Sequence, residues 1–229
     1  MLFRQLFDQE TSTFTYLLVD ASTRDAIIID PVYGKMQRDL DALKEMNAEL
    51  KYIVETHVHA DHITGAYDLK KATNAKFVAG VATGLSCGDT LLDEGEIIHF
   101  GNEVLHAIPT PGHTDGCTSY LWRDRIFTGD ALLINACGRT DFQQGSAEVL
   151  YDSLQKLLTY PDEYLVYPGH DYNNLRVSSI GQEKQVNPYI ANVSKEEFIE
   201  KMDNLQLPKP KKIDTSLPAN LRCGDRMAA

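Results

Sequence analysis

The seven residues from Thr56 to His62 constrain the fold of this chain more than any other segment. They place three histidines and one aspartate within six positions, directly after Lys51–Glu55, a run that predicts a β-strand. Histidine and carboxylate side chains bind zinc, iron or manganese, and an extended segment presents His57 and His59 on the same side. An isolated histidine is more often a structural residue, but a cluster this dense predicts a metal site at the end of a strand.

Three more potential ligands, His113, Asp130 and His170, follow the same pattern. Each comes directly after a glycine and just beyond a predicted strand. Glycine permits tight or left-handed turns, and ligands beyond several strand ends converge on one edge of the sheets, where α/β proteins commonly bind ligands. The two remaining histidines, His99 and His106, lie inside apolar strand patterns and are interpreted as structural.

Short strands and helices alternate along the chain with no internal linker or low-complexity segment. Apolar and β-branched runs predict strands at Phe14–Val19, Ala26–Ile29, Lys51–Glu55, Phe77–Ala79, Ile97–Phe100, Val104–Ile108, Ser119–Trp122, Arg125–Thr128 and, as the last of the series, Tyr164–Tyr167. Helical periodicity and a capping box of Ser194 and Glu197 predict helices at Met36–Met46, Gly65–Thr73, Glu148–Leu158 and up to Asn204. This order predicts one α/β domain over residues 1–229, with sheets covered by helices and an irregular extension over about 205–229.

Charge and cysteine content narrow the classes of partner and compartment. The net charge of −11 makes nucleic acid and anionic membranes poor partners. A basic stretch from Lys209 to Arg226 has five Lys or Arg residues against two Asp, a local charge of +3. The four cysteines, at 87, 117, 137 and 223, form no Cys-x-x-Cys pair, and 229 residues bury a sufficient core without disulfides. We therefore expect free thiols and, with no signal peptide at the N-terminus, a cytoplasmic protein.

The ligand types by themselves allow two arrangements. In a binuclear site that activates water for hydrolysis, the ligands divide into His57, His59 and His113 for one metal and Asp61, His62 and His170 for the other, bridged by Asp130. In a mononuclear site, His57, His113 and Asp130 form the face of two histidines and one carboxylate that suits non-haem Fe(II) and leaves coordination positions open.

The motifs His-Val-His-Ala-Asp-His, Pro-Gly-His-Thr, Thr-Gly-Asp and Pro-Gly-His together resemble the metallo-β-lactamase superfamily over roughly residues 10–175. The resemblance implies an αββα sandwich, two mixed sheets flanked by helices, with the metal site at its mouth. Within the superfamily, the sequence around the ligands is similar to the persulfide dioxygenases (sulfur dioxygenases) at 129–133, 137–145, 170–172, 187–188, 207–210 and 218–224. Glyoxalase II is expected to have a longer helical C-terminal region than the 59 residues that follow His170.

This resemblance implies an enzyme that oxidises glutathione persulfide with O₂ to sulfite and glutathione. Its single Fe(II) per chain is expected on the residues that match the family's ligands, His57, His113 and Asp130. The remaining members of the cluster would hold waters and orient those ligands: His59, Asp61, His62 and His170. The alternative function is a binuclear zinc hydrolase of glutathione thioesters, of the glyoxalase II type. A non-catalytic member of the fold is a third interpretation, which the intact ligand motifs disfavour.

Glutathione has two carboxylates and one amine, so its pocket needs fixed cations and hydrogen-bond donors. Guanidinium groups suit carboxylates better than ammonium groups do. We expect substrate to be bound by Arg139, in the loop after Asp130, by Arg222, in the basic stretch, and by the hydroxyl of Tyr172. Each of the three has a structural alternative, a salt bridge or a packed ring. Cys223 is interpreted either as a reactive thiol near this pocket or as a buried cysteine, and the sequence leaves a homodimer open.

Overall fold

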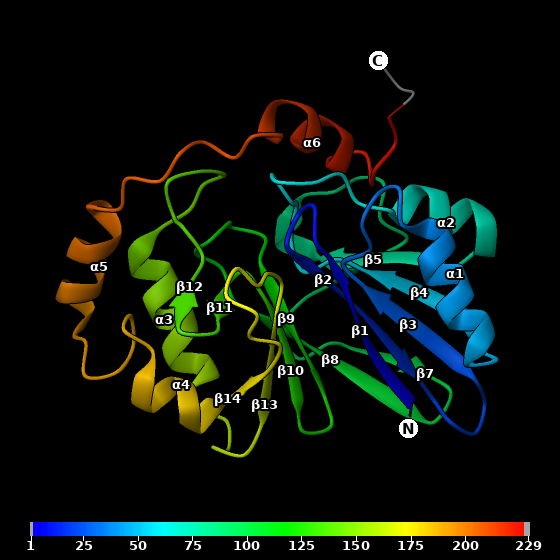
Figure 1. Cartoon of the computed structure of the whole chain (residues 1–229), viewed down its shortest axis with the longest axis horizontal. Coiled ribbons are helices and arrows are strands. Elements are labelled where there is room, and N and C mark those ends of the chain that lie inside the picture. Colours follow the sequence, from blue (N-terminus) through cyan, green and yellow to red (C-terminus); the bar gives the residue numbers. More distant parts are fainter. Residues whose placement is uncertain (1, 227–229) are drawn as a thin grey trace.

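Two six-stranded sheets lie face to face, and helices cover the outer face of each one (Figure 1). The computed structural model describes residues 2–226. The order of helix, sheet, sheet and helix confirms the αββα sandwich expected from the sequence. A last helix, α6 (Ile213–Asn220), lies across one end of both halves (Figure 1). No helix within residues 2–226 is long and apolar enough to cross a membrane.

The first sheet has the order β1-β2-β3-β4-β5-β6. Its strands are β1 (Leu2–Asp8), β2 (Thr13–Val19), β3 (Asp25–Ile29), β4 (Glu49–Val54), β5 (Lys76–Gly80) and β6 (Thr90–Leu92). The strands β1 to β3 pair antiparallel, and the strands from β3 to β6 pair parallel. Parallel neighbours need a crossover connection, which α1 (Met36–Glu45) makes after β3 and α2 (Ala66–Thr73) makes after β4. A short 3₁₀ helix, η1 (Val81–Thr83), follows β5.

The second sheet has the order β14-β13-β10-β9-β8-β7. Its strands are β7 (Ile97–Phe100), β8 (Glu103–Pro109), β9 (Thr118–Trp122), β10 (Arg125–Gly129), β13 (Leu165–Pro168) and β14 (Ser178–Ser179). Only β10 and β13 pair parallel, and the chain between them forms the hairpin of β11 (Leu132–Leu133) with β12 (Ala136–Cys137) and the helix α3 (Ala147–Leu157). With α3, the helices α4 (Ile180–Val186) and α5 (Lys195–Asp203) cover the outer face (Figure 1).

Strand β2 shows why the layers hold together. All seven of its residues are buried, as suits a strand that is covered on both faces. Leu17 and Val19 belong to the apolar cluster that includes α1 and α2, whereas Tyr16 and Leu18 belong to the cluster between the two sheets. Because side chains alternate along a strand, the seven residues of β2 pack against the helices on one face and against the second sheet on the other. Burial on each face contributes about 25 cal/mol per Å² of apolar surface.

The predicted strands and helices are confirmed within a few residues, and the capping box of Ser194 and Glu197 is present at the start of α5. Two expectations about the second half are wrong. Tyr164–Tyr167 is not the last strand, because β14 pairs with β13. The extension from about 205 is not irregular throughout, because α6 forms there with Pro218 inside it. Half of the residues of α6 are buried, so packing against the rest of the fold outweighs the low helix propensity of proline.

The expectation of free thiols is wrong for two of the four cysteines. Cys87, in the loop before β6, and Cys223, just after α6, form a disulfide across a separation of 136 positions. Cys117 and Cys137 are free. A disulfide requires its two Cβ atoms to be brought together by the fold, and nothing in the spacing of the cysteines indicates which pair will meet.

Candidate metal centre

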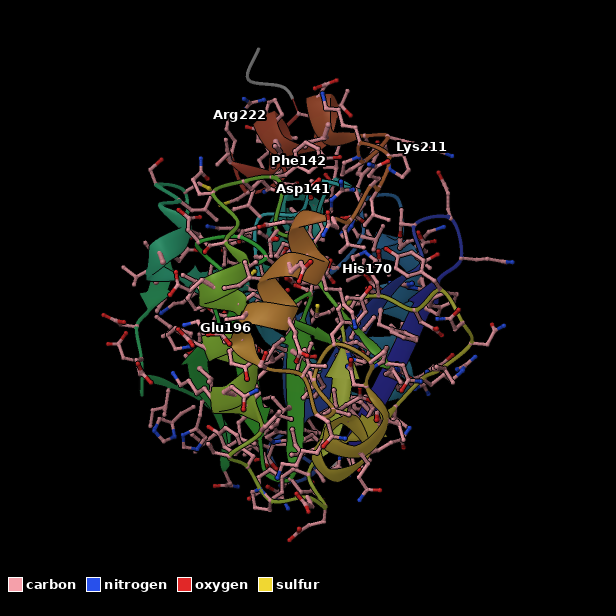
Figure 2. All side chains as sticks on the ribbon, turned by 90° about the vertical axis from the view of Figure 1, so that its left-hand side faces the viewer. Asp141, Phe142, His170, Glu196, Lys211 and Arg222 are labelled. Atoms are coloured by element: carbon pink, nitrogen blue, oxygen red, sulfur yellow. A yellow bond between two sulfur atoms is a disulfide. The ribbon has the colours of Figure 1, made fainter. Side chains whose placement is uncertain are left out.

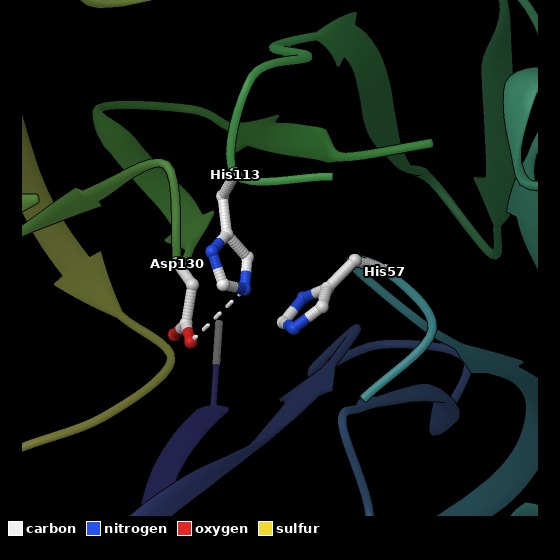
Figure 3. Close-up of side chains that lie close together, drawn as sticks. All are labelled: His57, His113 and Asp130. Carbon is white, nitrogen blue, oxygen red and sulfur yellow. Dashed lines mark ion pairs between the residues drawn. The ribbon is translucent and has the colours of Figure 1, made fainter. Parts of the chain in front are cut away.

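Three side chains from three loops meet at one end of the sandwich. His57 follows β4, His113 follows β8 and Asp130 follows β10, and one ligand atom of each lies within 4.8 Å of the other two. His113 Nε2 is 3.7 Å from Asp130 Oδ2, and the ring of His57 lies beside them (Figure 3). The arrangement offers two imidazole nitrogens and one carboxylate oxygen to a metal ion placed between them.

Two glycines allow these loops to approach so closely. Gly112 has a φ of +131°, and a Cβ there would lie 2.3 Å from the backbone of Leu150. Gly129 has a φ of +51°, and a Cβ there would lie 2.6 Å from the hydroxyl of Thr56. Glycine adopts such backbone conformations without steric cost. The two ligand loops can therefore pack directly against α3 and against the loop after β4.

Hydrogen bonds on the far side of each imidazole turn its other nitrogen toward the centre. The Thr56 hydroxyl donates to Asp30 at 2.8 Å, and its oxygen accepts from His57 Nδ1 at 3.0 Å. His113 Nδ1 donates to the carbonyl of Arg139 at 2.7 Å. Both rings therefore keep the Nε2 lone pair for a metal. Burial lowers the pKa of His57 well below its usual range, which keeps it in the neutral form that binds metals.

Asp130 is oriented by His170, which lies between two carboxylates. His170 donates from Nδ1 to Asp130 Oδ1 at 2.6 Å and from Nε2 to Asp61 Oδ2 at 2.9 Å. Burial lowers the pKa of His170, but the two carboxylates outweigh burial and hold that pKa well above its usual range. A charged imidazole donates from both nitrogens and has no lone pair for a metal. Burial raises the pKa of Asp130, yet the adjacent histidines lower it by more, so its Oδ2 is available as an anionic ligand.

A second group of potential ligands, His59, Asp61 and His62, lies beside the first. His59 Nε2 is 3.3 Å from Asp30 and 3.2 Å from Glu55. Burial lowers the pKa of His59, but these carboxylates raise it well above its usual range. Within residues 2–226, His59 Nδ1 and His62 Nε2 are buried without a hydrogen-bond partner. Buried polar atoms are normally satisfied by water or a ligand, so this group is suited to hold waters beside the centre.

A pocket of about 440 Å³ opens onto His113 and Asp130. Its wall includes Arg139 and Tyr172, two of the three predicted substrate-binding residues. Tyr172 is 69% exposed, and its ring stacks parallel to that of His170 with 5.9 Å between centroids. Tyr172 therefore stands at the rim, where its hydroxyl can reach a bound molecule.

The guanidinium of Arg139 is largely engaged by the protein itself. It donates to both carboxylate oxygens of Asp141 at 2.6 and 2.7 Å, and to the carbonyls of Pro208 and Leu207 at 2.8 and 3.3 Å. Of its five N–H groups, one is left for a ligand. The Arg139 side chain thus ties the segment after α5 to the loop that contains Arg139. The backbone carbonyl of the same residue orients His113.

The structure does not bring Arg222 to this pocket. Arg222 lines a separate pocket beside Cys223 and α2, and Figure 2 shows it near the top of the molecule, well above His170. Of the two interpretations of Cys223, the reactive thiol is wrong because this residue is disulfide-bonded. The position of Arg222 in the basic stretch did not predict its place in the fold, because the turn after α6 carries Arg222 and Cys223 toward α2.

Two residues that organise the loop after β4 (residues 56–64, called the metal loop below) were not found from the sequence. Asp30, directly after β3, accepts two hydrogen bonds of 2.8 Å from the first residue of the loop. Asn220 donates to the carbonyls of His59 and His62 at 2.8 Å each and accepts from the Thr64 N–H at 2.9 Å. A polar residue at a strand end was a usable signal for Asp30. Nothing local indicated Asn220, because it reaches the loop from α6.

Comparison with known proteins gives matches over nearly the whole chain. The model of the metallo-beta-lactamase superfamily matches residues 9–170. The mouse protein named "Persulfide dioxygenase ETHE1, mitochondrial" is 46% identical over 228 residues, which cover 98% of this chain and 89% of that protein. The human protein of the same name is 45% identical with the same coverage. The crystal structure of ETHE1 from Myxococcus xanthus has a TM-score of 0.97 and 52% identity, and it covers 98% of this chain and 100% of that one.

These relatives correct the location expected from the sequence. The mouse, Bos taurus and human proteins are all named as mitochondrial, which contradicts the cytoplasmic assignment. That assignment relied on the residue types of the first few positions and on free cysteines. Neither property reports the compartment of this chain, and two of its cysteines are in fact paired.

Proposed function

The chain belongs to the persulfide dioxygenases of the metallo-β-lactamase superfamily, and on this premise we propose that it oxidises glutathione persulfide at a single Fe(II) held by His57, His113 and Asp130. The reaction consumes one O₂ and one water for each persulfide and yields sulfite and glutathione. The observation that carries the proposal is the face of two imidazoles and one carboxylate, each oriented from behind by a hydrogen bond.

The donor set fits iron. Two histidines and one carboxylate on one face are typical of non-haem Fe(II) oxygenases, because an octahedral ion then keeps three open positions. These suffice for the persulfide sulfur and for O₂. When bound, the iron would supply the positions at which O₂ is activated toward the terminal sulfur, and that sulfur would provide the electrons that reduce O₂. The buried nitrogens His59 Nδ1 and His62 Nε2, which lack protein partners within residues 2–226, support the presence of ordered water at the same centre.

The protein residues around the centre have separate tasks. Arg139 holds the proton of His113 on Nδ1 through its backbone carbonyl, so that Nε2 stays a ligand. His170 helps to keep Asp130 anionic and fixes its orientation, and Asp61 holds His170 from its other nitrogen. Leu133 also lines the 440 Å³ pocket, and apolar walls of this kind limit the water that reaches the reacting sulfur.

The alternative, a binuclear zinc hydrolase, would need His170 and His59 as ligands. Each of these imidazoles lies against two carboxylates, Asp130 and Asp61 for His170 and Asp30 and Glu55 for His59. Both imidazoles have raised pKa values while no metal is bound, so a second metal would first have to displace a proton from each of them. This favours one metal over two.

We further propose that the glutathione part of the substrate binds along the wall formed by Arg139 and Tyr172. Tyr172 offers an exposed hydroxyl at the rim. Arg139 has one N–H group free. Two more N–H groups would become available if a substrate carboxylate replaced Asp141, because both carboxylates accept the same pair of guanidinium hydrogen bonds. Arg222 is not part of this proposal, because it lines another pocket.

The test combines metal analysis with oxygen uptake. Protein prepared without added metal should contain about one iron per chain, as a single three-ligand site requires. His113→Ala and Asp130→Ala should lose both iron and oxygen uptake with glutathione persulfide. His59→Ala should keep most of the iron while turnover falls. His106→Ala, on the exposed side of β8, is the matched control and should keep both properties.

Two outcomes would contradict the proposal. About two zinc ions per chain in active protein, with hydrolysis of a glutathione thioester and no oxygen uptake, would favour the hydrolase. Loss of iron from His59→Ala as complete as the loss from His113→Ala would place His59 among the ligands.

A further inference from the structure

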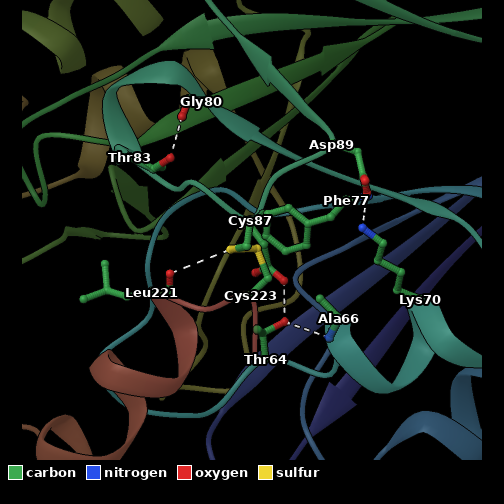
Figure 4. Close-up of a disulfide and its surroundings, with 11 residues drawn as sticks. Thr64, Ala66, Lys70, Phe77, Gly80, Thr83, Cys87, Asp89, Leu221 and Cys223 are labelled. Atoms are coloured by element: carbon green, nitrogen blue, oxygen red, sulfur yellow. Dashed lines mark hydrogen bonds and ion pairs between the residues drawn. A yellow bond between two sulfur atoms is a disulfide. The ribbon is translucent and has the colours of Figure 1, made fainter. Parts of the chain in front are cut away.

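The Cys87–Cys223 disulfide lies at a pocket that is separate from the metal centre. It joins the loop before β6 to the turn after α6 (Figure 4). A pocket of about 520 Å³ opens beside both half-cystines, and Lys70, Lys71 and Arg222 contribute to its lining. Cys87 is partly buried, whereas Cys223 is almost fully buried, so a molecule in the pocket would meet the Cys87 sulfur first.

The charge of this pocket differs from that of the chain, which has a net charge of −11. Its lining includes three cations and one carboxylate, Asp225. Lys70 forms an ion pair with Asp89 at 2.5 Å, and Lys71 lies 4.1 Å from the ring centroid of Tyr67. The pocket is therefore suited to an anion.

Arg222 is the cation that stands out in this pocket. Within residues 2–226 it forms no ion pair, and its Nε is buried without a hydrogen-bond partner. Leaving a buried charged donor unpaired is costly, and a guanidinium matches a carboxylate by its planar geometry. A ligand carboxylate would satisfy this group.

From the disulfide and the cations around it, we propose that Cys87–Cys223 is a thiol-exchange site for a small anionic thiol of the glutathione class. The thiolate attacks Cys87 Sγ, the protein S–S bond breaks, and Cys223 leaves as a thiolate beside Arg222 and takes up a proton. A second thiolate then attacks the small-molecule sulfur of the mixed disulfide on Cys87, so that Cys87 is the leaving group and takes up a proton. This releases the small-molecule disulfide and a Cys87 thiol, so that two thiols together give two electrons and two protons to the protein.

The exchange has a route to the metal loop through α6. Asn220 lies three positions before Cys223 and binds the carbonyls of His59 and His62 and the N–H of Thr64. The disulfide fixes the end of α6 to the loop before β6, and so holds Asn220 in place. Reduction removes that covalent restraint on α6. We infer that the reduced protein holds residues 59–64 less firmly than the oxidised protein does.

The first experiment counts thiols and needs no turnover, so it is independent of the proposed function. Protein purified without reductant is denatured, alkylated with iodoacetamide and weighed by mass spectrometry. The expected result is alkylation of Cys117 and Cys137 alone. Alkylation of all four cysteines in protein protected from reductants would overturn the proposal.

The second experiment measures how fast the native disulfide is reduced by glutathione and by 2-mercaptoethanol, which has no carboxylate, at equal thiolate concentrations. Arg222→Gln should slow reduction by glutathione roughly two- to fivefold more than reduction by 2-mercaptoethanol, the range for one solvent-accessible charge pair, because only glutathione offers Arg222 a carboxylate. Lys209→Gln, an exposed lysine in the same basic stretch that is paired with Asp214, is the matched control. Equal slowing with both thiols, or no slowing with either, would overturn the anionic-thiol site.

The third experiment follows amide hydrogen exchange in the peptide that contains residues 59–64. Exchange should be faster in reduced wild-type protein and in Cys87→Ser than in oxidised wild-type protein. Cys117→Ser, which removes a free buried thiol, should show the oxidised rate. Because reduced wild-type protein carries no substitution, a folding defect of Cys87→Ser would not obscure the result. Unchanged exchange on reduction would overturn the coupling to the metal loop.

Discussion

Asn220→Ala tests whether the C-terminal helix holds the metal loop in place. The side chain is 4% exposed and satisfies two carbonyls and one N–H of the loop, each at 2.8–2.9 Å. A buried group that loses its partner costs about 1–3 kcal/mol. Because water can reach some of the three groups after the substitution, we expect the free energy of unfolding to fall by about 3–5 kcal/mol. This is a large share of the roughly 5–15 kcal/mol typical of a folded domain.

The assay has two readouts, urea unfolding of the metal-free protein and the rate at which a chelator removes iron from the loaded protein. Asn220→Ala should lose stability and release iron faster, because residues 59–64 continue the loop that carries His57. Asn187→Ala is the matched control. Asn187 is equally buried and donates to the Ala136 carbonyl and to Glu183 at 3.0 and 2.8 Å.

The control should lose a similar free energy of unfolding but release iron at nearly the wild-type rate, since Asn187 binds the β11–β12 hairpin and not residues 56–64. If the two variants release iron equally fast, Asn220 contributes only general stability. If Asn220→Ala unfolds at the wild-type urea concentration, the three hydrogen bonds do not hold the loop at all.

Two further substitutions test the pocket wall and a buried charge. Arg139→Ala should raise KM for glutathione persulfide and lower kcat/KM by roughly ten- to 150-fold, the equivalent of about 1.5–3 kcal/mol, with iron content unchanged. Arg139→Lys should recover only part of the lost kcat/KM. An unchanged KM would remove Arg139 from the substrate site. Burial raises the pKa of Asp39 to about 6. Below about pH 4 the carboxyl is protonated in both the folded and the unfolded chain and does not lower the free energy of unfolding. As the pH rises from about 4 through 6 the unfolded chain loses this proton more readily than the folded chain does, so the free energy of unfolding falls. Asp39→Asn should therefore increase the free energy of unfolding by about 1–3 kcal/mol more at pH 8 than at pH 4, as measured by urea unfolding, and an equal effect at both pH values would contradict this account.

The metal loops were predictable because their signals are local. His57, His113, Asp130 and His170 each follow a strand, and three of them follow a glycine. Strand ends and glycine turns depend on neighbouring residues, so their positions could be read from short windows. The convergence of the loops at one end of the sandwich then follows from the strand order. The order of strands and helices predicted sheets covered by helices, and the resemblance to the metallo-β-lactamase superfamily supplied the αββα arrangement of the layers.

The C-terminal region was not predictable for the opposite reason. α6 forms around Pro218 because half of its residues are buried against other parts of the chain. The Cys87–Cys223 bond spans 136 positions, and the place of Arg222 depends on the turn that follows the helix. Local propensity carries no information on such contacts.

The sequence by itself determined which residues gather at the metal centre, because ligand type and strand-end position are properties of short segments. It left open which of the gathered residues bind a metal, since seven histidines and aspartates allow one ion or two. The tertiary structure bears on that choice by placing charged partners that are distant in the sequence. His170 lies between Asp130 and Asp61, and His59 lies against Asp30 and Glu55. Opposite charges at 3 Å stabilise the protonated imidazole, and only the folded chain sets those distances.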